Sequence, residues 1–101
     1  MRATGADPMA PGSPGLRVTD REDGMVIDDV APDSAAARQG LKPGNRLLAV
    51  GGRDVGSMGP FAAGFLLRGP IGSTVEITVG GANGPYNVTL ERGAVKEMLG
   101  W

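Results

Sequence analysis

Apolar and polar residues alternate in several short stretches of this chain, and such alternation predicts half-buried β-strands. The alternation is clear at residues 16–20, 74–79 and 86–91, and further strands are expected at residues 25–30, 46–50 and 53–55. Turn signals separate them, among them Asp23-Gly24 after the first stretch and the glycine-rich loop 80–85 before the last. The stretch at 53–55 is the shortest, so we expect it to form only a brief edge strand.

Two short helices are expected between these strands. The first, over residues 35–39, is rich in alanine, can be capped by Asp33 or Ser34, and can end on Gly40 in a left-handed conformation. The second, over residues 60–67, begins with a proline, whose missing N–H is harmless in the first helical turn. The predicted order is β-β-α-β-(β)-α-β-β, without an internal repeat.

The length and composition of the chain fit one small domain. With 101 residues it has room for a single modest core, built mainly from aliphatic side chains because only 4% of its residues are aromatic. The 18 glycines and 8 prolines indicate many turns and short elements. We expect a flexible N-terminal arm or linker over residues 1–14, the domain over residues 15–93, and a C-terminal tail over residues 94–101.

The distribution of charged and apolar residues argues against nucleic-acid binding and against a membrane-spanning helix. The net charge is −1, and the basic residues form no stripe interleaved with aromatic residues, so nucleic acid is not an expected partner. No apolar run approaches the length of about 18 residues that a membrane-spanning helix needs. Residues 1–15 lack the apolar stretch of a signal peptide, so we expect a cytoplasmic protein or a segment of a longer secreted chain.

The chain contains neither cysteine nor histidine. These absences exclude disulfides, thiol chemistry and Ser-His-Asp catalysis, and they remove the commonest ligand of transition metals. Ser34 is better explained as a helix cap and Ser73 as a turn residue than as nucleophiles. Asp28 and Asp29 are neighbours on a predicted strand and point to opposite faces, so they cannot act as a pair. We therefore expect no catalytic residues, no metal site and no cofactor.

Two stretches of the sequence resemble a known family. Residues 34–52, SAAARQGLKPGNRLLAVGG, resemble the PDZ core signature, with its Gly-Leu pair, its tight turn and the basic residue before an apolar strand. Residues 66–75, LLRGPIGSTV, are similar to a segment of bacterial PDZ domains in carboxy-terminal processing proteases and other envelope proteases. The resemblance covers residues 15–92. It implies a PDZ-like fold that is mainly β with two helices, arranged as a partly open antiparallel β sandwich or barrel.

The resemblance also implies peptide binding by strand addition. An extended peptide would pair with the edge of the first strand, beside the second helix, and place its side chains in pockets at alternate positions. Its terminal carboxylate would lie on the backbone amides of Gly15, Leu16 and Arg17. The peptide-binding residues implied in this way are Gly15, Leu16, Arg17, Val18, Pro60, Phe61, Gly64 and Leu67.

Several of these assignments have a structural alternative. Leu16, Val18 and Leu67 would line the pocket for the last peptide side chain, but core packing also explains them. Gly64 falls inside the second helix, where glycine costs about 0.5–1 kcal/mol relative to alanine. Its missing side chain would either widen the groove or let the helix pack closely on a strand. Arg17 stands where the family's Gly-Leu-Gly-Phe loop has its second glycine.

The expected function is recognition of a peptide or protein C-terminus, or of an extended peptide segment, by the substrate-recognition or regulatory domain of a bacterial protease. The alternative is a docking module that binds a folded partner in an envelope or secretion assembly. In both roles we expect a non-catalytic binding domain that is monomeric in isolation. A periplasmic or cell-envelope location is implied by the resemblance alone.

Overall fold

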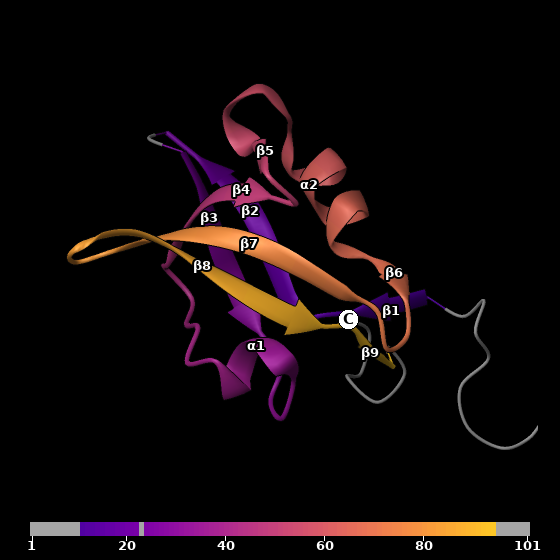
Figure 1. Ribbon diagram of the computed structural model, residues 1–101. Helices are drawn as coiled ribbons and strands as arrows, with labels where there is room; N and C mark the ends of the chain where they lie inside the picture. Colours follow the sequence, from indigo (N-terminus) through magenta and orange to yellow (C-terminus); the bar gives the residue numbers. More distant parts are fainter. Residues whose placement is uncertain (1–10, 23, 95–101) are drawn as a thin grey trace, which may run out of the picture.

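A computed structural model describes residues 11–22 and 24–94 of the chain (Figure 1). Nine strands, two α-helices and one 3-10 turn, η1, make up this described part. In chain order they are β1 (Pro11–Ser13), β2 (Leu16–Arg21), β3 (Gly24–Val30), α1 (Ala35–Arg38), β4 (Arg46–Val50), β5 (Arg53–Asp54), η1 (Val55–Ser57), α2 (Pro60–Leu67), β6 (Gly69–Pro70), β7 (Thr74–Gly81), β8 (Gly84–Glu91) and β9 (Gly93–Ala94).

The strands form two antiparallel sheets. The larger has the order β2-β3-β4-β7-β8, with β5 paired to β4 beside this path. The smaller has the order β6-β1-β9. The long β7–β8 hairpin crosses the face of the domain, while α1 and α2 lie toward opposite ends of it (Figure 1). The fold is mainly β with two helices and antiparallel sheets, as the sequence predicted.

Most of the predicted elements are confirmed, and two strands are longer than predicted. α2 covers residues 60–67 and β4 covers residues 46–50, both as expected. β7 and β8 extend into the loop predicted at 80–85, because Gly81 pairs with Gly84 across a tight turn. Gly84 has a φ of 112°, a conformation that glycine adopts without the steric cost of a side chain.

Short strands extend past the predicted limits of the domain at both ends. Residues 11–13 were expected in a flexible arm, but they form β1, which pairs with β6 and β9. Ser13 is only 3% exposed, and Pro14 is among the most deeply buried side chains. Ala94, expected in the tail, pairs with Gly12 as part of β9. The rest of the predicted arm and tail, residues 1–10 and 95–101, lies outside the described residues.

The N-terminus of α1 is capped by one of the two residues that the sequence offered. The hydroxyl oxygen of Ser34 accepts a hydrogen bond from the Ala37 N–H at 3.1 Å, and the hydroxyl donates to the Ala31 carbonyl at 2.7 Å. The helix ends after Arg38, and Gly40 follows with a φ of 81°. Both predicted helix signals therefore act as expected.

Side chains from the larger sheet and from both helices meet in one hydrophobic core. Its largest fully buried side chains are Ile27, Leu47, Ile77, Leu90, Val50 and Val79, with Pro14 beside them. α1 contributes Ala35 and Ala36, and α2 contributes Ala63 and Leu67. Since Phe61, Phe65 and Tyr86 are all exposed, this core is aliphatic, as the low aromatic content predicted.

Arg92 joins the end of β8 to the end of α2. Its Nε donates to the Leu67 carbonyl at 2.9 Å, and its Nη2 donates to the Leu66 carbonyl at 3.1 Å. Its Nη1 donates to the Ser73 hydroxyl and the Thr74 carbonyl, both at 2.9 Å. Two carbonyls of the last helical turn are thereby satisfied by a cation, which also favours the negative end of the helix. Burial lowers the pKa of the Arg92 guanidinium, but arginine stays charged at neutral pH.

Replacing Arg92 by lysine should destabilise the domain. A lysine keeps the charge but cannot reach four acceptors with a planar fork, so we expect the free energy of unfolding to fall by about 2 kcal/mol. Urea denaturation followed by far-UV circular dichroism measures this change. The matched control is Arg53→Lys at an exposed position, which should change stability by less than about 0.5 kcal/mol. Equal stabilities of the two variants would contradict the role assigned to Arg92.

Candidate functional site

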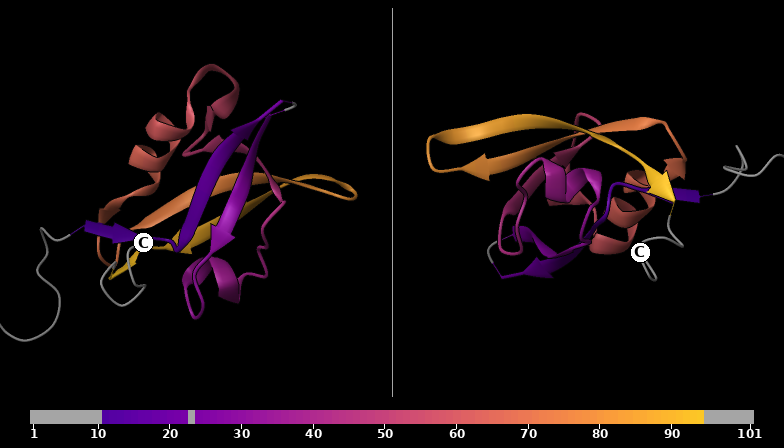
Figure 2. Two further views of the ribbon diagram at one scale, coloured as in Figure 1. Left: turned by 180° about the vertical axis from the view of Figure 1, so that it is seen from behind. Right: turned by 90° about the horizontal axis from the view of Figure 1, so that it is seen from below.

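The free edge of β2 lies beside α2. In the described part of the chain, β2 pairs with β3 alone, so the backbone of its other edge is open to another extended segment. Seen from behind, β2 and α2 run next to each other with this edge turned toward the helix (Figure 2). These two elements are the walls that the sequence predicted for a peptide groove.

Local sequence fixes the limits of α2. Pro60 occupies the first helical position after Gly59, where its fixed φ suits the helix. Arg68 ends the helix by adopting an extended conformation, with φ −91° and ψ 154°, and the chain continues into β6. Ala63 and Leu67 face the core, so the other sides of the helix face solvent or a groove.

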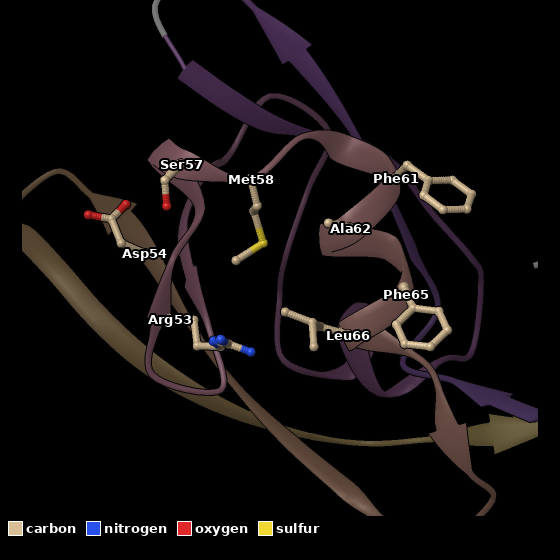
Figure 3. Close-up of a pocket in the computed structure, with 8 residues that line it drawn as sticks. All are labelled: Arg53, Asp54, Ser57, Met58, Phe61, Ala62, Phe65 and Leu66. Carbon is tan, nitrogen blue, oxygen red and sulfur yellow. The ribbon is translucent and has the colours of Figure 1, made fainter.

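Two hollows flank α2. The larger, of about 890 Å³, lies between the helix and the β5–η1 segment (Figure 3). Its lining residues are Arg53, Asp54, Ser57, Met58, Phe61, Ala62, Phe65 and Leu66. The smaller, of about 420 Å³, is lined by Pro60, Phe61, Gly64, Phe65 and Arg68. The Phe61 and Phe65 rings stand one turn apart on the side of α2 that faces away from β5 (Figure 3).

Gly64 lies at an open place on the helix surface. A Cβ built on this residue would have no atom of another part of the fold within 4 Å. Close packing on a strand, one of the two explanations that the sequence left open, therefore does not account for this glycine. The half-exposed Gly64 and the strongly exposed Phe61 (89%) and Phe65 (75%) form a notch with aromatic sides.

The residues predicted to line an apolar pocket lie largely in the core. Leu16 is 5% exposed and Leu67 is 3% exposed, and both belong to the hydrophobic core cluster. Val18 is half-buried and packs against that cluster. All three predicted residues thus lie in the hydrophobic core or against it, and core packing is the arrangement that the structure gives Leu16 and Leu67.

The loop that leads into β2 is held by hydrogen bonds within the domain. The Gly15 N–H donates to the Ser13 hydroxyl oxygen at 3.0 Å. The Gly15 carbonyl accepts from Ala31 at 2.7 Å, and the Pro14 carbonyl accepts from the Ala36 N–H of α1 at 3.0 Å. Gly15 has a φ of 91°, and a side chain there would collide with the cap of α1. Glycine is therefore required at this position.

Sequence reasoning missed three residues of this region. Ser13 and Pro14 were assigned to a flexible arm, although they shape the loop in front of β2. Phe65 was not among the predicted site residues, although it lines the notch at Gly64. The identity of Pro14 could have shown from the sequence that this position offers no backbone N–H to a ligand.

The described residues lack other features that would suggest a different kind of site. No three side chains of the types that bind metals come together in residues 11–22 and 24–94. Over the same ranges, no helix is long and apolar enough to cross a membrane. The ion pair between Arg21 and Asp28 spans 3.6 Å with both side chains exposed, so its contribution to stability is small.

Comparison with known proteins gives one matching family model and similar solved structures. The family model described as PDZ domain matches residues 26–79 of the chain. Among solved structures, the photosystem II D1 C-terminal processing protease superposes with a TM-score of 0.78 at 24% sequence identity. That match covers 85% of this chain and 24% of the protease, so the chain spans about a quarter of the protease's length. None of the curated proteins matches the chain.

Replacing Gly64 by alanine should stabilise the domain. The new methyl group meets no neighbour, so the helix propensity of alanine should raise the free energy of unfolding by about 0.5–1 kcal/mol. Thermal and urea denaturation measure the effect. The reverse change at an exposed position of the same helix, Ala62→Gly, is the matched control and should lower stability by a similar amount. A destabilised Gly64→Ala variant would mean that the open space at this position is wrongly assigned.

Proposed function

Because the chain belongs to the PDZ domain family, we propose that it binds extended peptide segments, which add as a further strand to the free edge of β2 beside α2. The observation that carries this proposal is the unpaired edge of β2, which lies next to a helix with an open glycine. Main-chain hydrogen bonds along such an edge supply affinity without regard to sequence, and side-chain pockets supply specificity.

The peptide-binding residues proposed for this groove are those that the family resemblance implied. On the strand they are Gly15, Leu16, Arg17 and Val18, and on the helix they are Pro60, Phe61, Gly64 and Leu67. The exposed Phe61 and the open Gly64 offer the surface that a bound side chain would contact. The buried Leu16 and Leu67 support this surface from below.

We propose further that the domain serves a bacterial protease as its substrate-recognition or regulatory part. The support is the structural likeness to a C-terminal processing protease, of which this chain matches only a fraction. A docking module for a folded partner is the second candidate, and the exposure of Phe61 and Phe65 on one side of α2 favours it. A folded partner would bury these rings, whereas a short peptide needs the edge of β2.

Binding should be weak and should map to the groove. We expect dissociation constants near micromolar or weaker for a panel of ten-residue peptides that alternate valine and threonine, carry two lysines and end in alanine, valine, leucine or phenylalanine. Amide chemical shifts of residues 16–21 and 61–67 should change on titration, and those of the β7–β8 hairpin should not. Shift changes confined to the hairpin, or absent for every peptide, would contradict strand addition at β2.

A side chain placed over the groove should block it. Gly64→Leu fills open space and should fold, and we expect it to weaken peptide binding by about ten-fold or more. Ala62→Leu adds a similar side chain to the same helix on the side of the larger hollow, and it should leave affinity within about two-fold. Equal losses in both variants would place the peptide elsewhere on α2.

The isolated chain should hydrolyse neither peptides nor esters. Its sequence has no histidine or cysteine, Ser34 is explained as a helix cap, and Ser73 is explained as a turn residue. A single-turnover assay at high protein concentration is the measurement. Cleavage that survives repurification and disappears when one serine is changed to alanine would overturn this expectation.

A further inference from the structure

The loop at the start of β2 decides which kind of peptide the groove can take. Assuming the peptide-binding function proposed above, we infer that the domain recognises extended segments independently of a terminal carboxylate. Capture of a chain terminus needs two or more backbone N–H groups that converge on one anion. The donors of this loop are used within the fold or do not exist.

Two of the positions in front of β2 offer nothing to an anion. Pro14 has no backbone N–H. The Gly15 N–H is already bonded to the Ser13 hydroxyl oxygen at 3.0 Å, inside a buried part of the loop. Ser13 itself is 3% exposed, so its hydroxyl does not move aside into solvent without a wider change in the loop.

No two backbone donors at the start of β2 converge on one point. The Gly15 carbonyl accepts from Ala31 of the segment after β3, and Arg17 lies opposite Asp29 on that same side. Alternate residues of an antiparallel strand bond to the same neighbour, so the backbone of Arg17 faces β3. The backbones of Leu16 and Val18 face the free edge instead, about 7 Å apart along the strand. Donors at that spacing do not converge on one anion, as an anion-binding nest requires.

The residues predicted to line a pocket for a terminal side chain are largely buried as well. Leu16 and Leu67, which would line it, are part of the packed core. A carboxylate placed at this end would lose its hydration without gaining the hydrogen bonds that offset that loss. Farther along the groove, the free edge of β2 and the notch at Gly64 remain open to any extended backbone and its side chains.

One set of peptides tests this inference on the unmodified domain. The tightest-binding peptide of the panel above is prepared as the free acid, as the C-terminal amide, and with a Gly-Ser-Gly-Ser extension beyond its last residue. We expect the three dissociation constants to agree within about three-fold. A free acid that binds about ten-fold tighter than both other forms would overturn the inference while leaving the proposed function intact. If none of the three forms binds, the proposed function itself fails and the inference fails with it.

A double variant tests the physical cause. Ser13→Ala/Pro14→Ala removes the acceptor of the Gly15 N–H and adds an N–H at position 14, so the loop gains two donors. With the folded variant, checked by circular dichroism, we expect the free acid to gain about five-fold or more over the amide relative to the unmodified domain. An unchanged ratio in the folded variant would contradict the assignment of specificity to these donors. If the variant does not fold, the three-peptide comparison decides alone.

Discussion

The hydrogen bonds of one arginine determine where the second helix lies. Arg92 holds the last turn of α2 through two carbonyls and holds the start of β7 through the Ser73 hydroxyl and the Thr74 carbonyl. Its side chain fills the space over backbone atoms of Gly12 and Gly69, where any larger residue would collide with it. The width of the space between α2 and β2 therefore depends on a residue that is distant from both in sequence. Because the bonds are charge-assisted and partly buried, they are stronger than neutral hydrogen bonds at the surface.

The free edge of β2, which we propose as a binding surface, also exposes the protein to unwanted strand pairing. An unpaired strand edge invites pairing with any extended chain, including another copy of the same protein. Arg17, Asp20 and Arg21 place charges along this strand, and α2 stands over its free edge. Charges and a neighbouring helix are common ways in which proteins limit indiscriminate edge pairing. Access to the edge is therefore restricted to segments that fit beside the helix.

Alternation in the sequence predicted several strands, because these have one buried face, and capping residues and Pro60 predicted the two helices. Alternation failed at β1 and β9, which are two or three residues long and contain too few side chains to show any period. β1 pairs with both β6 and β9, which are far away from it in the chain. The family resemblance predicted that β2 and α2 would flank the groove, but it did not predict the hydrogen bonds of the loop before β2. The bond from Gly15 to Ser13 and the closure around Leu16 and Leu67 arise from tertiary packing, which no local pattern encodes.

The small three-stranded sheet brings the entrance and the exit of the domain together. Gly12 of β1 pairs with Ala94 of β9, so the first and last described strands are hydrogen-bonded neighbours. A module with this geometry can be inserted into a surface loop of another domain without forcing the two ends of that loop apart. The third strand of the sheet is β6, which follows α2 almost directly. In such an insertion, both connections to the host domain would leave from the same small sheet that holds the strand after α2.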